Sequence, residues 1–252
     1  MAELSVERLT LGFGGLAVLN DISLSVERGE LLALIGPNGA GKTSVFNCIS
    51  GIYCPGGAIR FRGLNLVGRK SHAIAAMGIG RTFQHGELFA DMSVEDNVLA
   101  GRHLRMRSNA FFELLGLASV RREERRQSHL VEEILHLVGI GAYRDSDAGG
   151  LPFDVQKKVG IARALACEPA VLLLDEPSSG LSREEREELA CLMMRIKEEL
   201  GLAMIWIEHD MQMVADLADR IHVLDYGCSL ADGTPQEVLC DPRVIGAYLG
   251  TP

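Results

Sequence analysis

The feature that most constrains the fold of this chain is the segment GPNGAGKT at residues 36–43. An apolar run at residues 31–35 precedes it and a helix-compatible run at residues 44–49 follows it, which is the order strand, glycine-rich turn, helix. Its glycines permit backbone angles that side chains forbid, so successive N–H groups can point inward as an anion-binding nest. The N-terminal end of the following helix adds positive potential. The segment therefore predicts a loop that binds the phosphates of a nucleotide.

Two side chains at the end of this loop suit a bound nucleoside triphosphate. Lys42 can reach the β- and γ-phosphates, and the hydroxyl of Thr43 can ligate Mg²⁺. We expect the nucleotide to contact the loop and the residue after it, namely Gly36, Pro37, Asn38, Gly39, Ala40, Gly41, Lys42, Thr43 and Ser44.

Composition limits the classes of protein to consider. The 252 residues are 47% hydrophobic, which is enough for a large core, and the net charge of −9 argues against nucleic acid as a main partner. No apolar run approaches the roughly 18 residues of a membrane span, and the N-terminus has no signal-peptide pattern. The six cysteines lack metal-site or disulfide-framework spacing, so we expect reduced and mostly buried thiols of a cytosolic protein.

The N-terminal third predicts short strands and turns. Residues 4–11 and 21–28 alternate apolar and polar side chains, as strands do, and a glycine-rich turn between them holds Phe13. This ring is either an ordinary hydrophobic loop residue or a platform on which adenine stacks, which requires the sheet to fold back towards the phosphate loop. Ser71 is expected to cap a short helix that ends at Met77.

The middle of the chain is helical in pattern. Ser93 and Asp96 resemble a capping box at a helix start, and residues 120–138 place apolar side chains at helical spacing. The charged run at residues 121–126 predicts a solvated helix face, with contact to anionic lipid headgroups as the alternative.

Three further segments predict strands with polar side chains at their carboxyl ends, where open α/β sheets bind ligands. Residues 170–176 end in Asp175 and Glu176, a carboxylate for Mg²⁺ and a general base for the attacking water. Residues 203–208 lead to His209, a candidate contact of the γ-phosphate. Gln84 follows another strand and is either a ligand-facing amide or an ordinary strand-end glutamine.

Together these residues resemble the nucleotide-binding subunit of an ABC transporter. GPNGAGKT is similar to the Walker A motif, VLLLDE at residues 171–176 is similar to Walker B, and residues 179–182 resemble the D-loop, although Ser182 stands where Asp or Asn is common. The resemblance implies that Gln84 is the Q-loop glutamine, His209 the switch histidine and Phe13 the adenine-stacking aromatic residue.

The resemblance also implies a fold and a reaction. The expected fold is the α/β P-loop NTPase of ABC type, a mixed-sheet core with an antiparallel β subdomain and a helical subdomain. Residues 1–87 and 168–252 would form the core and residues 88–167 the helical subdomain. ATP and Mg²⁺ are the implied cofactors; the implied metal ligands are Thr43, Gln84 and Asp175, and the implied catalytic residues are Lys42, Gln84, Glu176 and His209.

Further segments resemble one branch of the family, the Liv-type ATPases of high-affinity branched-chain amino-acid uptake. They include MSVEDNVLAGRH at residues 92–103, IEHDM at 207–211 and the C-terminal stretch 233–250, and the long insertion around 104–128 favours the larger of that branch's two ATPases. The resemblance implies an importer ATPase at the cytoplasmic face of the cell membrane. Its expected partners are two membrane permeases, a second ABC ATPase and, indirectly, an extracytoplasmic substrate-binding protein.

The chain departs from the family in the LSGGQ signature. The aligned residues are Leu151, Pro152, Phe153, Asp154, Val155 and Gln156. Asp154 replaces a glycine that approaches the γ-phosphate held by the opposite subunit. As a cap it would stabilise its helix by roughly 0.5–2 kcal/mol. A carboxylate ~4 Å from a phosphate charge costs roughly 4 kcal/mol at an effective dielectric constant near 20. We therefore expect a competent site on this chain and a weakened site on its partner.

Alternative functions stay open at this point. An ATPase of lipid or lipopolysaccharide export has similar IEHDM-like endings, but such proteins usually lack the 104–128 insertion. A catalytically weakened regulatory ABC subunit would also explain Asp154. ABC ATPases of DNA repair or ribosomes usually carry coiled-coil insertions or tandem cores, and P-loop GTPases carry an Asn-Lys-x-Asp motif; this sequence has none of these.

Overall fold

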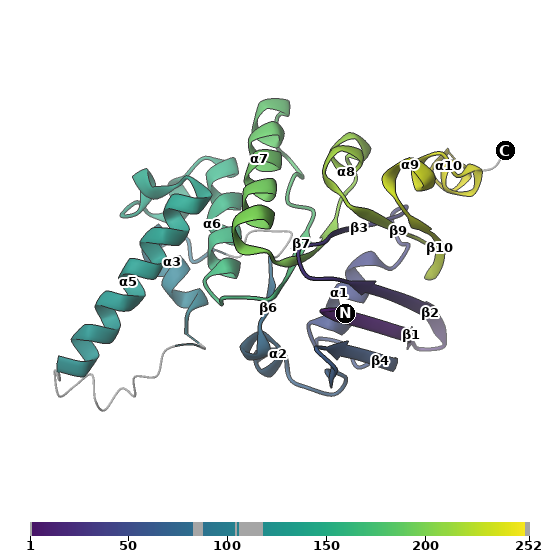
Figure 1. Cartoon of the computed structure of the whole chain (residues 1–252), viewed down its shortest axis with the longest axis horizontal. Helices are drawn as coiled ribbons and strands as arrows, with labels where there is room; N and C mark the ends of the chain where they lie inside the picture. The colour runs from purple at the N-terminus through teal and green to yellow at the C-terminus, as the bar shows by residue number, and fades with distance from the viewer. Residues whose placement is uncertain (1, 83–87, 104, 106–117, 250–252) are drawn as a thin grey trace. The chain divides into compact units, whose positions relative to one another are not determined.

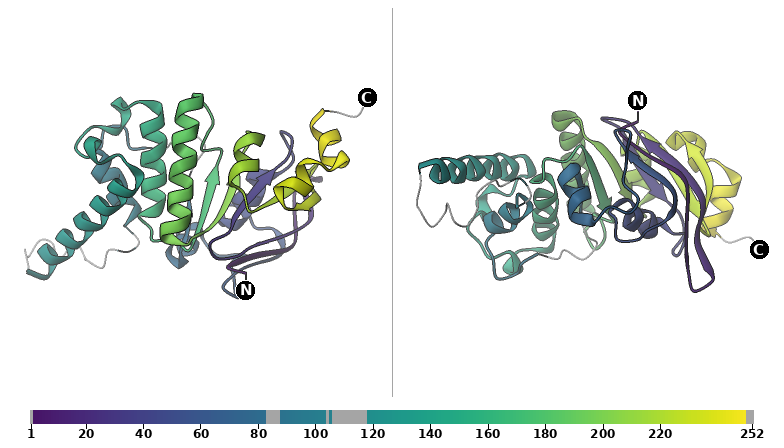
Figure 2. Two further views of the ribbon diagram at one scale, coloured as in Figure 1. Left: turned by 45° about the horizontal axis from the view of Figure 1, so that its top comes forward. Right: turned by 90° about the horizontal axis from the view of Figure 1, so that it is seen from below.

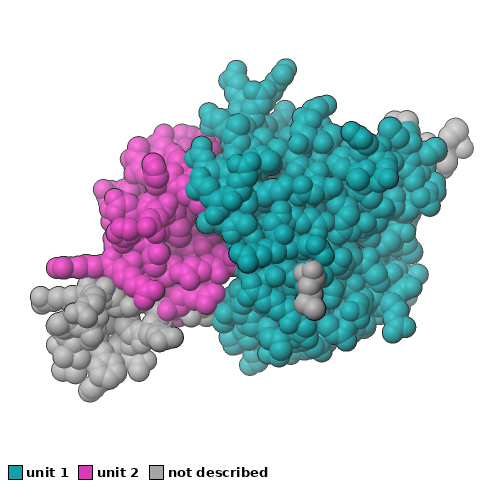
Figure 3. Space-filling view, in the orientation of Figure 1, with its two compact units in different colours: residues 1–84, 170–252 teal, residues 85–169 magenta. Residues whose placement is uncertain are grey.

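The computed structural model describes residues 2–82, 88–103, 105 and 118–249. The chain divides into two compact units, which Figure 3 colours separately: residues 1–84 with 170–252, and residues 85–169. The second unit contains the segment 88–167 that we expected to form the helical subdomain. Each unit is described by itself below.

Unit 1 begins with an antiparallel sheet in the order β2-β1-β4-β5. Its strands are β1 (Leu4–Phe13), β2 (Leu16–Val26), β4 (Gly56–Phe61) and β5 (Leu64–Asn65). The first hairpin is tighter than expected, because β2 begins at Leu16 rather than near residue 21. Gly14 and Gly15 both have positive φ angles, 55° and 89°, and make the two-residue turn that pairs Phe13 with Leu16.

A second, mostly parallel sheet has the order β10-β9-β3-β8-β7-β6. Its strands are β3 (Leu31–Ile35), β6 (Ile79–Arg81), β7 (Val171–Asp175), β8 (Ala203–Ile207), β9 (Arg220–Asp225) and β10 (Cys228–Gly233). Only β10 runs antiparallel to its neighbour among these strands. Every residue of β3, β7 and β8 is buried, which explains their unbroken apolar sequences. The α/β fold with a mixed-sheet core is therefore confirmed.

The parallel sheet is covered on both faces (Figures 1 and 2). One face packs on α1 (Lys42–Ile49) and the antiparallel sheet, in a single apolar cluster that includes Phe46 of α1. The other face carries α7 (Arg183–Leu200), α8 (Met211–Leu217), α9 (Pro235–Leu239) and α10 (Pro242–Leu249). Ile35 at the end of β3 lies in a cluster with Val244 of α10, so the C-terminal helix supports the strand that leads into the glycine-rich loop.

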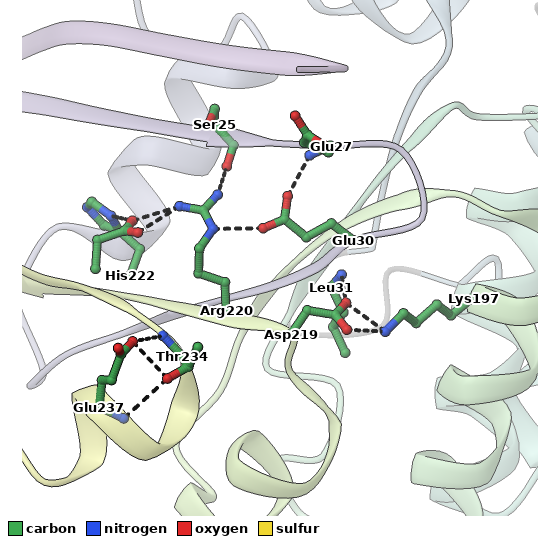
Figure 4. A network of polar contacts seen from close by, with 11 residues as sticks. Ser25, Glu27, Glu30, Leu31, Lys197, Asp219, Arg220, His222, Thr234 and Glu237 are labelled. Carbon is green, nitrogen blue, oxygen red and sulfur yellow. Dashed lines mark hydrogen bonds and ion pairs between the residues drawn. The ribbon is translucent and has the colours of Figure 1, made fainter. Parts of the chain in front are cut away.

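A polar network joins the two sheets near the amino ends of β3 and β9 (Figure 4). Arg220 of β9 donates to Glu30 at 2.8 Å, to both oxygens of Asp232 at 2.8 and 2.9 Å, and to the carbonyl of Ser25 on β2. This arginine therefore ties β2, the start of β3 and β10 to β9. Figure 4 also shows the contacts of Leu31, Lys197, Asp219 and His222.

Unit 2 is helical, as expected. It contains α3 (Val94–Gly101), α5 (Ala118–Val138), α6 (Phe153–Leu165) and the short 3-10 turns η1 (Gly141–Tyr143) and η2 (Ala148–Gly150). Gly101 lets α3 approach α6, since a Cβ there would lie 2.2 Å from the carbonyl oxygen of Arg163. The Ser93 cap is confirmed, because its hydroxyl accepts from the N–H of Asp96 at 3.0 Å. Within the described ranges, no helix combines the length and apolarity needed to cross a bilayer.

Two local expectations were wrong. The first concerns α2 (Ser71–Met77), whose N-cap residue is Lys70, without a side-chain cap bond, so Ser71 is a helical residue rather than the cap. The second concerns the thiols: Cys48 is buried and Cys167 partly buried, but the other four cysteines are exposed (Cys54, Cys191, Cys228 and Cys240). Cys191 has apolar neighbours in the sequence, yet the helical turn of α7 places it opposite the buried Leu189 and Leu192.

The two helix starts at Ser182 and Ser71 allow a matched test of capping. Ser182 accepts from the N–H of Glu185 at 3.3 Å and its own N–H donates to the Glu185 carboxylate at 2.6 Å, a complete capping box before α7. We expect Ser182→Ala to lower the free energy of unfolding by about 1 kcal/mol, because the N–H of Glu185 loses the side-chain oxygen that accepts its hydrogen bond. Ser71→Ala, without a cap bond to lose, should change it by less than about 0.5 kcal/mol. Equilibrium urea unfolding measures both, and equal effects would contradict the assignment.

Candidate functional site

The glycine-rich loop adopts a conformation that depends on its glycines. Gly36, Gly39 and Gly41 have φ angles of 149°, 83° and 101°. A Cβ at Gly36 would lie 2.0 Å from the carbonyl oxygen of Leu224, and one at Gly41 would lie 2.6 Å from Cδ2 of Leu19. The loop is therefore enclosed by β9 and β2. At Gly36 the backbone of β9 leaves no room for a side chain, and at Gly41 the positive φ angle disfavours one.

The loop ends in the first turn of a helix, where backbone N–H groups lack intrahelical acceptors. Helix α1 begins at Lys42, two residues before the run we expected, and the first described helical bond runs from the N–H of Val45 to the carbonyl of Gly41 at 3.0 Å. The N–H groups of the first turn, at residues 42–44, lie before this bond and have no intrahelical acceptor. Such a turn is a binding site for phosphate oxygens.

Lys42 is held inside this loop. Its Nζ donates to the carbonyl oxygens of Gly36 at 2.6 Å and Pro37 at 3.1 Å, and the residue is buried. Burial lowers the pKa of Lys42, while the negative charges of Glu176 and Asp175 oppose that shift. The ammonium group therefore lies beside the loop backbone and within the field of the two carboxylates.

Asp175, at the end of β7, has the features of a metal ligand. Its Oδ2 accepts from Nη2 of Arg81 at 3.0 Å, while its Oδ1 is buried and has no hydrogen-bond partner in the part of the chain that the structure describes. Burial raises the pKa of this carboxyl group, and the hydrogen bond and charge of Arg81 oppose the rise. An unsatisfied buried carboxylate oxygen and the exposed Thr43 hydroxyl are hard oxygen donors, so they fit Mg²⁺.

Glu176 and His209 form a pair at the ends of β7 and β8. The Nε2 atom of His209 lies 2.9 Å from Oε1 of Glu176. Glu176 has a φ angle of 48°, which is unusual for a residue with a side chain, and its N–H donates to the carbonyl of Ile207 at 3.0 Å.

A buried glutamate that we did not predict organises the loops around this pair. Glu208 is 2% exposed, and its carboxylate accepts from the N–H groups of Ser178 at 3.0 Å and His209 at 2.9 Å. It thus joins the loop after β7 to the loop after β8, beside a cavity of about 290 Å³ that Glu176 and His209 line. The sequence signal was available, since Glu208 is the first polar residue after the apolar run of β8.

Phe13 lies at the tip of the first hairpin with a half-exposed ring. The ring packs edge-on against Tyr53, with 5.1 Å between centroids and 73° between planes. The same hairpin folds back to the glycine-rich loop, because Val18 and Leu19 of β2 are the neighbours of Gly41. The condition that we set for an adenine platform is therefore met, although the stacking itself stays a prediction.

The signature residues form the start of α6 in unit 2. Pro152 is the N-cap residue and makes no side-chain cap bond, so Asp154 lies in the first turn and the expected capping role was wrong. Its Oδ2 lies 3.5 Å from Nζ of Lys158, one turn further along. Phe153 is half exposed, and the side-chain amide of Gln156 donates to the carbonyl of Leu151 at 2.9 Å.

Most of the predicted residues of unit 1 meet at one edge. β3, β8 and β7 are parallel neighbours, so the loop after Ile35, the His209 segment and Asp175–Glu176 all lie at their carboxyl ends. Gln84 lies outside the described residues, so its predicted role is untested. Arg81, at the end of β6 and three residues before Gln84, is a residue of this edge that we did not predict.

Comparisons with known proteins agree with this geometry. Residues 19–179 match the family described as ABC transporter, and residues 230–252 match the branched-chain amino acid ATP-binding cassette transporter segment. The chain is 40% identical over 248 residues, 98% of its length and 97% of the relative's, to the high-affinity branched-chain amino acid transport ATP-binding protein BraF of Pseudomonas aeruginosa. The identity and both shares are the same for LivG of Escherichia coli strain K12.

A solved structure has the same fold throughout. The ADP conformation of an ATP-binding cassette of an ABC transporter superposes with a TM-score of 0.86, at 27% identity, over 100% of both chains. The matched family, the identity along the full length and the nucleotide-binding edge lead to one conclusion. The chain belongs to the ABC transporter family, as an ATP-binding and ATP-hydrolysing subunit similar to those of the branched-chain amino acid systems.

Proposed function

We propose that this chain powers the uptake of branched-chain amino acids, or of related amino acids or amides. The observation that carries the proposal is the 40% identity to BraF over 98% of the chain. The match of residues 230–252 supports it separately. It would act from the cytoplasmic face of the cell membrane, paired with a second ABC ATPase on two permeases that receive substrate from an extracytoplasmic binding protein.

Transport by the reconstituted complex tests this function. The chain would be purified from membranes with its permeases, placed in liposomes and supplied with ATP inside and the binding protein outside. Uptake of labelled leucine, isoleucine or valine would support the proposal. Uptake confined to another class of solute, or nucleotide-driven release of lipid, would contradict it.

ATP would bind across the edge built by β3, β7 and β8. The loop backbone, Lys42 and the first turn of α1 would hold the phosphates, and the ring of Phe13 would hold the adenine. Thr43, Asp175 and Gln84 would hold Mg²⁺, which neutralises charge on the β- and γ-phosphates. The fit of Asp175 rests on its buried, unsatisfied Oδ1.

Glu176 and His209 would act on the terminal phosphate. Glu176 would accept a proton from the attacking water as general base, since its carboxylate lies at the end of β7 beside Asp175. His209 now lies 2.9 Å from that carboxylate, so it can orient Glu176 before reaching the γ-phosphate. The signature residues of α6 would complete the site on the partner subunit.

Replacing the general base separates binding from hydrolysis. We expect Glu176→Gln to lower kcat by about 10²–10⁴-fold, because the amide cannot accept the proton, while ATP affinity stays within about two-fold. ATPase assays and nucleotide titration measure the two quantities. Glu187→Gln changes an exposed carboxylate paired with Arg183 and serves as the control, with no loss of rate expected. A rate for Glu176→Gln equal to that of the control would disprove the role.

The adenine platform predicts an effect on KM. Phe13→Ala should raise the KM for ATP by roughly ten-fold at nearly constant kcat, since stacking of a base on an aromatic ring contributes about 1–3 kcal/mol. Phe13→Trp should retain most of the affinity. Leu16→Ala, which removes a 71% exposed side chain from the other end of the same turn, should leave KM unchanged. Equal KM values for Phe13→Ala and Leu16→Ala would refute stacking.

Asp154 predicts an asymmetric pair of sites, with the weaker one on the partner. Asp154→Gly should raise the rate at the partner's site by roughly ten-fold, from a net relief of about 1–2 kcal/mol at the phosphate, and so raise the total ATPase rate of the reconstituted complex about two-fold. Asp154→Asn separates two causes of a low ATPase rate. If Asn restores the rate, the negative charge of Asp154 is the cause; if only Gly restores it, the side chain prevents the close approach of the backbone to the phosphate. If neither variant increases the ATPase rate or ATP-driven dimerisation, the hypothesis that Asp154 weakens the partner's site is wrong.

A further inference from the structure

Arg81 connects the two halves of the proposed metal site. Its Nη2 donates to Oδ2 of Asp175 at 3.0 Å, and its Nη1 donates to Oδ1 of Asn47 at 2.8 Å and to Oγ of Ser50 at 3.3 Å. Asp175 ends β7, whereas Asn47 and Ser50 lie on and just after α1. One guanidinium group therefore spans the strand that carries the carboxylate and the helix that carries Thr43.

The position of Asn47 makes this span relevant to the metal. Asn47 follows Thr43 by four residues, so both side chains lie on the same face of α1, one turn apart. Arg81 thus holds the face of the helix that presents the Thr43 hydroxyl. Its guanidinium group also lies 5.6 Å from the ring centroid of Phe46, which restricts it further.

The two oxygens of Asp175 are used differently. Oδ2 is occupied by Arg81, and Oδ1 is left buried without a hydrogen-bond partner among the described residues. The side chains of Arg81 and Asp175 are 9% and 2% exposed, so water does not compete freely for either. The carboxylate is fixed in one orientation, with its remaining oxygen available to a cation.

We propose that Arg81 is a positioning residue for the divalent cation, which orients Asp175 and holds it in register with Thr43. The inference rests on the proposed Mg²⁺ site. Partners of this kind, which contact a metal ligand rather than the metal, fix ligand orientation, and their loss typically costs about 10–100-fold in metal affinity. Arg81 would therefore act on metal binding and leave the metal-independent part of nucleotide binding unchanged.

Metal titration of Arg81→Met tests the inference without relying on turnover. The full chain would be saturated with a non-hydrolysable ATP analogue, and Mn²⁺ affinity would be measured by electron paramagnetic resonance. We expect Arg81→Met to weaken Mn²⁺ binding by about ten-fold or more. Its affinity for the same analogue in EDTA should stay within about two-fold of the wild type. Equal losses with and without metal would indicate a merely structural role and overturn the inference.

Three further variants sharpen the test. Asn47→Ala removes one anchor and keeps the charge of Arg81, so it should weaken Mn²⁺ binding by a smaller factor. In an Asp175→Asn background, Arg81→Met should change Mn²⁺ affinity by less than about two-fold, because the residue acts through that carboxylate. Arg60→Met breaks an exposed ion pair with Glu7 and is the control, with neither affinity altered.

The outcomes separate this inference from the proposed metal site. If the wild-type chain binds the analogue equally with Mn²⁺ and in EDTA, the metal site fails and the role of Arg81 with it. If the wild type gains affinity from Mn²⁺ and Arg81→Met gains as much, only the role of Arg81 fails. If Arg81→Met does not fold, Arg81→Lys replaces it; lysine cannot donate from two separate nitrogens to Asn47 and Asp175, so the same loss of Mn²⁺ affinity is expected.

Discussion

The backbone of the glycine-rich loop is the constraint on which unit 1 depends. Gly36 lies against the Leu224 carbonyl, Gly41 lies against Leu19, and the N–H of Gly227 donates to the carbonyl of Ala40 at 3.1 Å. The loop is thus enclosed by β9, the turn before β10 and the antiparallel sheet. Because the enclosing segments are distant in the sequence, the loop can reach this conformation only when both sheets are in place, which couples formation of the nucleotide site to the fold.

The fold could be predicted from the sequence, because apolar runs with polar ends specify buried parallel strands. The position and orientation of individual helical residues could not. Apolar runs that end in GPNGAGKT, Asp175–Glu176 and His209 require parallel, fully buried strands, and β3, β7 and β8 are such strands. The exposed Cys191 and the missing cap at Ser71 depend instead on which way one helix turns and where it starts. Local composition does not encode those angles, since packing against other elements decides them.

The residues of the candidate site also fall into a group that could be predicted and a group that could not. The type and order of its residues could be inferred, because the chemistry of phosphate binding and proton transfer demands them. Glu208 and Arg81 were not assigned roles, since they act through partners that are 30 and 94 residues away in sequence, Ser178 and Asp175. A buried charge needs such partners, and a single sequence does not say which ones it finds.

The ion pair of Asp154 changes the size of the expected repulsion in the partner's site. With Lys158 at 3.5 Å, the carboxylate and the ammonium together carry no net charge, so at long range a phosphate meets a dipole rather than an anion. Asp154 lies in the first turn of α6 and Lys158 one turn further along, so we expect the carboxylate to be the nearer group to a phosphate at this helix start and the repulsion to persist at contact distance. The penalty is therefore smaller than the roughly 4 kcal/mol of an isolated charge at an effective dielectric constant near 20. A penalty of this size would slow ATP hydrolysis at the partner's site rather than abolish it. A working transporter is therefore compatible with Asp154 in the signature.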